Sequence, residues 1–441
     1  MKKTGVIVFL LALLMGLFTA SCIKSNEDNV DKEIKAVPVV RQIAPKPQSE
    51  EGQTTTTPKS QPEHAQEQLP NVIESTPPIP VEIIPEEVPA LPQPKVSLDI
   101  KIGQMLIVGF RGFSVNAKSP IVWDIQKFHL GGVILFDYDI TLKSSKRNIK
   151  SPKQVKKLVN SLQAASNIPL FIAIDQEGGK VQRLKNKFGF PYTVSAQYLG
   201  KKNNLELTYK HATKMAKTLA SLGINFNFAP VVDLNTNPNN PVIGKLKRSF
   251  SANPKIVTNH ALEFIRAHNE HGVLCILKHF PGHGSSTKDS HLGLVDVTNT
   301  WKNIELFPYK EIISAGMADA IMTAHVFNRH YDPTHPATLS KRIVGGVLRT
   351  DLRYDGVIVS DDMQMKAITS HYSFEYAIQA TLEAGIDIII IGNNLKYEED
   401  IVARTVVVIK QLIQDGKLSE KRIDESYRRI QTLKHWLATR P

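Results

Sequence analysis

Residues 273–284, VLCILKHFPGHG, decide the fold, because five apolar residues run there directly into a polar loop. A short apolar run bounded by Gly and Pro predicts a buried β-strand over Val273–Leu277. The glycines and the proline that follow exclude a regular helix. In α/β proteins, the loops that leave the carboxyl ends of parallel strands carry the chemistry. We therefore expect the segment from Lys278 onward to belong to an active site.

Seven other apolar runs repeat this pattern, and amphipathic helical stretches separate them. Buried parallel strands are nearly continuous in Val, Ile and Leu, as these runs are. Eight strands alternating with helices predict an α/β fold, a (β/α)₈ TIM-like barrel, as a single catalytic domain over residues 97–441. The predicted strands are Met105–Phe110, Gly132–Phe136, Leu170–Asp175, Asn225–Val232, Val273–Leu277, Ala320–Ala324, Gly356–Ser360 and Ile386–Ile391. Predicted helices include residues 152–165, 205–222, 255–271, 376–384 and 398–414, with a closing helix over 420–439 outside the barrel.

The first 22 residues have the pattern of a lipoprotein-type signal peptide. Lys2 and Lys3 precede an apolar run over residues 6–18, which is short for a membrane span of about 20 residues. The small residues that end at Cys22 resemble a bacterial lipobox, in which Cys22 would be acylated. The alternatives are a cleaved signal without lipid or an uncleaved anchor. In each case we expect an exported protein, and with acylation a cell-membrane or outer-membrane lipoprotein whose barrel lies in the periplasm or at the cell surface.

Residues 23–96 are expected to form a disordered, Pro-rich linker. Positions 23–94 hold 13 of the 26 prolines, one glycine and no aromatic residue. Such a composition buries too little apolar surface to offset the entropy of ordering the chain. The segment has 12 acidic and 6 basic side chains while the whole chain carries +12, so the barrel is strongly basic. Cys275, inside an apolar run, is expected to be a buried free thiol.

The basic charge is open to several interpretations. It is typical of proteins that meet anionic wall polymers, lipid head groups or nucleic acid. Lysines dispersed for solubility are an equally good explanation, because no basic cluster interleaved with aromatic residues is present. We expect no nucleic-acid partner, a glycan substrate, a membrane contact through the lipid anchor, and a monomer.

Two more strand ends carry polar residues. Asp175-Gln176-Glu177-Gly178-Gly179-Lys180-Val181-Gln182-Arg183 follows one apolar run, and Ser360-Asp361-Asp362-Met363 ends another. Charged residues at such positions need a partner or a function. Asp361 can act as a nucleophile, a metal ligand or a cap of the following helix, although Asp362 could supply that cap instead.

The segment over residues 278–291, which we call the histidine loop, offers two kinds of chemistry. Asp289 and His291 are spaced so that the carboxylate can accept a hydrogen bond from the imidazole and raise its pKa, which suits proton transfer. The alternative is a pair of solvated loop residues. A possible metal set is also present, formed by His279, His283, Asp289 and His291. No second histidine pair at another strand end completes its shell, although His325 and His330 follow the sixth predicted strand. Lys278 opposes that possibility, because a cation beside a metal ion is unfavourable, and we expect neither a metal nor another cofactor.

These three motifs together resemble glycoside hydrolase family 3, in particular its β-N-acetylglucosaminidase branch, from about residue 98 to about residue 415. The resemblance implies that Asp361 is the nucleophile and that His291, tuned by Asp289, is the general acid/base. It places sugar contacts at Asp175, Arg183, Arg248, Lys278 and His279. The inserted Leu246-Lys247 departs from the family's spacing before Arg248.

The implied activity is that of a retaining exo-β-N-acetylglucosaminidase. It would remove terminal non-reducing N-acetylhexosamine residues from peptidoglycan or chitin-like fragments through a covalent glycosyl-enzyme. The alternatives are a family 3 β-glucosidase, a glycoside phosphorylase, or a lipoprotein that binds wall glycans without cleaving them. Members of this branch are commonly cytoplasmic, so the export signal is a second departure.

Overall fold

The computed structural model describes residues 96–439, in which eight parallel strands close into a barrel. Around the barrel the strands follow the order β1-β12-β11-β9-β7-β6-β3-β2. This confirms the predicted (β/α)₈ class. The predicted signal peptide, Cys22 and the linker up to residue 95 lie outside the described residues. The barrel strands are β1 Leu106–Gly109, β2 Gly132–Leu135, β3 Phe171–Ile174, β6 Phe226–Asn227, β7 Leu274–Phe280, β9 Ala320–Thr323, β11 Val357–Asp362 and β12 Ile388–Ile391.

The strands are buried on both faces, since side chains fill the barrel interior and helices cover its outside. Every residue of β1, β2, β3, β9 and β12 is buried, which explains why these strands read as continuous apolar runs rather than alternating ones. The four isoleucines of β12 pair with β1 on one side and β11 on the other. Cys275 is a buried free thiol, as expected.

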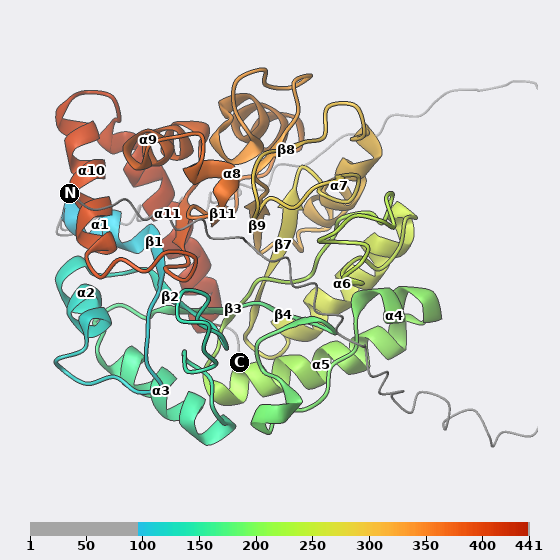
Figure 1. The fold of residues 1–441 in the computed structure, drawn as a ribbon, viewed down its shortest axis with the longest axis horizontal. Helices are drawn as coiled ribbons and strands as arrows, with labels where there is room; N and C mark the ends of the chain where they lie inside the picture. The colour runs from blue at the N-terminus through green and yellow to red at the C-terminus, as the bar shows by residue number, and fades with distance from the viewer. Residues whose placement is uncertain (1–95, 440–441) are drawn as a thin grey trace, which may run out of the picture. The chain divides into compact units, whose positions relative to one another are not determined.

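Helices follow the strands and surround the barrel, as Figure 1 shows. Several begin with a side-chain cap: Ser151, Asn204 and Ser373 each accept a hydrogen bond from a backbone N–H two or three residues into the helix. The helices are α1 Leu98–Gln104, α2 Pro120–Phe128, α3 Pro152–Ala164, α4 Ala196–Lys202, α5 Leu205–Leu222, α6 Pro254–Asn269, α7 Phe307–Ser314, α8 Lys366–Thr369, α9 Phe374–Ala384, α10 Ile401–Gln414 and α11 Glu420–Thr439, with the shorter turns η1 Asn186–Phe188, η2 Asn303–Leu306 and η3 Ala337–Leu339 and the π-helix η4 Arg342–Asp351. None of the helices within residues 96–439 is long and apolar enough to cross a membrane.

Three strand boundaries differ from the prediction in ways that affect the site. One is β11, which continues to Asp362 instead of ending at Ser360, so that Asp361 is a strand residue. β7 continues to Phe280 instead of ending at Leu277, so Lys278 and His279 are strand residues with fixed directions. β6 covers only Phe226–Asn227 rather than Asn225–Val232. Pro230 lacks an N–H for the ladder, and pairing resumes only as a bridge between Val231 and Lys278.

The closing helix α11 covers the amino-terminal end of the barrel. Its Lys434 donates hydrogen bonds to the backbone carbonyls of Gly131 and Pro169, which lie just before β2 and β3. Its Arg429 contacts Asp387, directly before β12. At the opposite end, where the strands finish, the loops form the surface of the barrel. Two short strand pairs extend these loops: β4 Gln176–Gly178 with β5 Val181–Gln182, and β8 Val295–Asp296 with β10 Val326–Phe327.

Candidate active site

A cavity of about 470 Å³ opens at the carboxyl ends of the strands. Its size is within the range of ligand sites in proteins. Seven of the strand ends and their following loops contribute to its wall, which is the arrangement that a closed barrel imposes on residues far apart in sequence. All eight residues predicted for catalysis and sugar binding line it: Asp175, Arg183, Arg248, Lys278, His279, Asp289, His291 and Asp361.

Lys278 joins two carboxylates on the cavity floor. Its Nζ atom lies 2.8 Å from Asp175 Oδ1 and 2.7 Å from Glu177 Oε1. Arg183 donates to the other oxygen of Asp175 at 2.9 Å. Burial raises the pKa of Asp175, but Lys278 and Arg183 outweigh it and hold that pKa well below the ordinary value. Asp175 is therefore ionised and able to accept hydrogen bonds from hydroxyl groups.

Arg248 connects this group to His279. Its guanidinium donates to both oxygens of Glu177 at 2.8 Å, and its Nη2 lies 3.1 Å from His279 Nε2. Arginine only donates, so Nε2 of His279 is an acceptor and Nδ1 carries the hydrogen. That Nδ1 lies 2.6 Å from Asp233 Oδ2. His279 is thus held by one donor and one acceptor.

Glu177 and Asp233 were not among the predicted site residues, although both hold predicted ones in place. Asp233 accepts from the backbone N–H of His283 as well as from His279, and its carboxylate is fully buried. A signal was present for each of them. Glu177 stands in the motif after β3, and Asp233 follows an apolar run, where a charged residue needs a partner.

Asp361 differs from the carboxylates described above, because its side chain makes few contacts. Its Oδ1 accepts from the backbone N–H of Asp362 at 2.8 Å, and no side-chain donor within residues 96–439 forms a hydrogen bond to it. Burial raises its pKa, but the nearby His325, His279 and His291 outweigh this, and the net pKa is lowered. Asp361 is an ionised carboxylate facing the cavity.

The neighbouring Asp362 has a different environment. Its Oδ1 accepts from the backbone N–H groups of Gln364 and Gly392 at 3.0 and 2.9 Å, and burial raises its pKa to about 6. The alternative in which one of the two aspartates caps the next helix is wrong. Helix α8 begins at Lys366 after Met365. The Asp362 carboxylate instead links the turn at Gln364 to Gly392, which follows β12.

Asp289 and His291 form the predicted pair. His291 Nδ1 lies 2.7 Å from Asp289 Oδ1, and that oxygen also accepts from the backbone N–H of His291 at 2.9 Å. The hydrogen bond from the imidazole to Asp289 raises the pKa of His291, and the Asp361 charge adds to the effect. The His291 side chain is 54% exposed, so its Nε2 edge is accessible from the cavity mouth. The pair can give and take a proton near neutral pH.

The possible metal set is not brought together. His283 is held between Ser286 and Ser290, and burial lowers its pKa to about 4. His325 donates from Nε2 to the backbone carbonyl of Asp362, and His330 is exposed. Across residues 96–439 no group of three or more His, Cys, Asp or Glu side chains is arranged to hold a metal ion.

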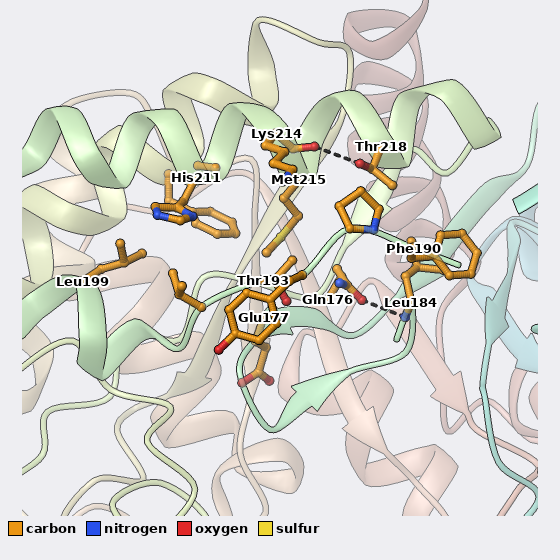
Figure 2. Close-up of a pocket in the computed structure, with 15 residues that line it drawn as sticks. Gln176, Glu177, Leu184, Phe190, Thr193, Leu199, His211, Lys214, Met215 and Thr218 are labelled. Atoms are coloured by element: carbon orange, nitrogen blue, oxygen red, sulfur yellow. Dashed lines mark hydrogen bonds between the residues drawn. The ribbon is translucent and has the colours of Figure 1, made fainter. Parts of the chain in front are cut away.

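A second, much smaller cavity lies behind the floor of the site. Figure 2 shows it between α5 and the β4–β5 segment, with Met215 and His211 above and Glu177 below. Its volume of about 20 Å³ holds about one water molecule. Leu184 donates its backbone N–H to Gln176 Oε1 at this wall. The cavity is too small for a sugar. Its apolar side chains lie behind Glu177, one of the two carboxylates that Lys278 contacts.

The barrel and the chemistry at its mouth define the class: this is an α/β-barrel protein of the glycoside hydrolase type. An ionised carboxylate and a second proton-transferring group at one cavity are what glycoside cleavage requires. Residues 97–433 match the family described as "Glycosyl hydrolase family 3 N terminal domain", and the chain belongs to this family.

Named relatives agree with this assignment. The chain is 36% identical to "Beta-hexosaminidase A" of Pseudoalteromonas piscicida over 372 residues, which cover 76% of this chain and only 60% of that protein. It is 37% identical to "Beta-hexosaminidase" of Tolumonas auensis over 292 residues, 66% of this chain and 83% of that protein.

Among solved structures, a family 3 β-N-acetylglucosaminidase from a Paenibacillus species superposes with a TM-score of 0.71 at 37% identity, covering 78% of this chain and 63% of that one. A β-N-acetylhexosaminidase from Beutenbergia cavernae gives 0.69 at 29% identity, covering 77% and 99%.

Proposed function

We propose that this protein is a retaining exo-β-N-acetylglucosaminidase that removes terminal N-acetylhexosamine residues from peptidoglycan or chitin-like fragments. The observation that carries the proposal is that Asp361 lines the same cavity as the Asp289–His291 pair. It is an ionised carboxylate that accepts no side-chain hydrogen bond within residues 96–439. The β-hexosaminidase names of the relatives support the substrate class.

The proposed reaction has two displacements. Asp361 attacks the anomeric carbon as its bond to the leaving oxygen breaks, and His291 gives that oxygen its proton. His291 then takes a proton from water, which attacks the same carbon and releases Asp361. Two inversions give net retention. Asp175 accepts hydrogen bonds from sugar hydroxyls, while Arg183, Arg248 and Lys278 donate to sugar oxygens.

The test is hydrolysis of a chromogenic N-acetyl-β-glucosaminide by the wild-type protein and by Asp361→Ala and His291→Ala. We expect Asp361→Ala to remove nearly all activity and His291→Ala to lower kcat/KM by about 10²–10⁴-fold. NMR of the first product should show the β-anomer. An α-anomer as first product, or an active Asp361→Ala protein, would refute the mechanism. A glycosyl phosphate product in phosphate buffer would identify a phosphorylase instead.

We also propose that the protein is exported, acylated at Cys22 and monomeric. The basic, apolar and small-residue order of positions 1–22 supports the first two statements. Cells fed a clickable fatty acid should label the wild-type protein and leave Cys22→Ser unlabelled. Equal labelling of both proteins would show that the lipid is not on Cys22.

A further inference from the structure

Helices α3 and α5 carry lysines on their outward sides. The lysines of α3 are spaced i, i+3, i+4 and those of α5 are spaced i, i+4, i+7, so each set forms one stripe along its helix. The two helices pack beside each other on the barrel surface (Figure 1). All six side chains are exposed. We call them the lysine face: Lys153, Lys156, Lys157, Lys210, Lys214 and Lys217.

The charge of the lysine face is not neutralised by any residue between positions 96 and 439. Within residues 96–439, none of its six ammonium groups lies in an ion pair, whereas Lys101, Lys410 and Lys417 elsewhere on the barrel pair with aspartates. Uncharged side chains lie beside the lysines, among them Thr213, Ser221, Asn160 and Ser161. The exposed Glu206 is the one acid on the two helices. The face therefore presents positive charge to whatever lies outside it.

The surrounding segment enlarges this charge. Residues 143–217 contain 16 Lys and Arg against three Asp and Glu. Of these, Asp175 and Glu177 line the cavity together with Lys180, Arg183 and Lys185, which leaves 13 basic residues and one acid, the exposed Glu206, outside it. Residues 351–425, on the other side of the barrel, contain 8 basic against 14 acidic residues. The positive charge is concentrated on one side, which is not expected of lysines dispersed for solubility.

The side-chain types on the lysine face indicate which class of anionic partner it binds. Neither α3 nor α5 contains an arginine, the residue that binds a single phosphate in a bidentate manner. The face has no aromatic side chain for stacking on nucleobases. Flexible ammonium groups along two neighbouring helices suit an extended anionic plane. We propose that the lysine face docks the side of the barrel on an anionic phospholipid surface.

This orientation has a consequence for the catalytic cavity. The cavity opens at the carboxyl ends of the strands, whereas α3 and α5 lie on the flank of the barrel. A barrel docked on its flank opens its cavity along the membrane plane rather than into the bilayer. The proposal rests on the charge distribution alone and does not depend on the proposed glycosidase activity.

The test compares vesicles of phosphatidylcholine alone with vesicles that also contain phosphatidylglycerol, using the full chain. Any contribution of the apolar amino terminus or a lipid is common to both, so the ratio of the two affinities reports the electrostatic contribution. The lysine substitutions then assign it to one face. The variant Lys210→Gln/Lys214→Gln/Lys217→Gln should lower that ratio by about 100-fold, at the usual contribution of a lysine near an anionic surface. The ratio should also fall as salt is raised.

The matched control is Lys310→Gln/Lys341→Gln/Lys421→Gln, which removes three exposed lysines from other sides of the barrel. None of the three forms an ion pair with a residue in the described range 96–439. It should keep the wild-type ratio. Acetylation of lysines by a soluble reagent, followed by mass spectrometry, should show protection of the lysine face only with anionic vesicles. Equal ratios for both variants would overturn the proposal, as would protection by duplex DNA or protection without vesicles, which would indicate the acidic linker.

Discussion

Two adjacent aspartates at the end of β11 have opposite properties, and this difference supports the proposal that Asp361 is the nucleophile. Asp362 accepts two backbone N–H groups, and burial raises its pKa to about 6. Asp361 makes only one such contact, and neighbouring histidines lower its pKa. The sequence already predicted Asp361 as the free residue and Asp362 as a candidate helix cap. It did not predict that Asp362 is held by Gly392, which is 30 positions away, because no local pattern contains that information.

A prediction at this scale concerns the pH dependence of His291. Its hydrogen bond to Asp289 raises its pKa, so the imidazole stays protonated, and able to act as an acid, to a higher pH than a histidine without this bond. Asp289→Asn removes the negative charge, which lowers the pKa of His291. We expect the alkaline limb of the kcat/KM profile to move to lower pH, with a larger loss of activity at pH 9 than at pH 6.

The control is Asp296→Asn, in β8 on the same connection between β7 and β9 but outside the cavity lining. Its pH profile should match that of the wild type. If Asp289→Asn lowers activity equally at every pH, Asp289 orients the loop without tuning the imidazole.

At the scale of elements, the sequence predicted all eight barrel strands but not where each stops. The extension of β7 through Lys278 and His279 depends on pairing with β9 and on the bridge to Val231, both long-range contacts. Apolar runs show which residues are buried, whereas these polar strand residues are buried through partners. Glu177 and Asp233 were missed as supporting residues for the same reason.

The turn η2 gives a second prediction. Glu305 lies beneath the histidine loop, 2% exposed, and a Cβ atom at Gly282 would stand 2.7 Å from its Oε2. Burial, assisted by the Asp233 charge, raises the pKa of Glu305 from 4.5 to about 7. The folded state thus keeps a proton that the unfolded chain releases, and stability is lost as pH rises from about 4.5 through 7.

Glu305→Gln stays neutral and should not undergo this loss. Urea unfolding at pH 5 and pH 8 should show the variant gaining, relative to wild type, up to about 3 kcal/mol of unfolding free energy at the higher pH. Glu311→Gln, at an exposed position on the following helix α7, should change little at either pH. A wild-type protein whose stability, relative to Glu305→Gln, does not vary between these pH values would contradict a neutral Glu305.

At the scale of the whole molecule, the two ends of the barrel differ in structure. The carboxyl end holds the cavity, and the amino-terminal end is sealed by α11. The sequence predicted α11 as a helix outside the barrel from its periodicity. It did not show that the helix crosses the strand ends, because that position is set by contacts with residues before β2, β3 and β12.

Asp387 is the main ionic contact in this seal, and its removal gives the last prediction. The carboxylate is fully buried and contacts Arg349, Arg422 and Arg429, while Ser426 of α11 donates to it at 2.7 Å. Asp387→Asn removes the buried counter-charge of Arg349 and Arg422, whereas Arg429 keeps Asp355. The loss should cost about 3–5 kcal/mol of unfolding free energy and lower Tm.

Asp355→Asn is the matched control, because Asp355 also pairs with Arg429 but its side chain is 68% exposed. Solvent screens that pair, so we expect a cost below about 1 kcal/mol. Thermal unfolding followed by circular dichroism separates the two variants. Equal shifts of Tm for Asp387→Asn and Asp355→Asn would show that α11 is held by apolar packing, and that the buried carboxylate does not fix it to the barrel.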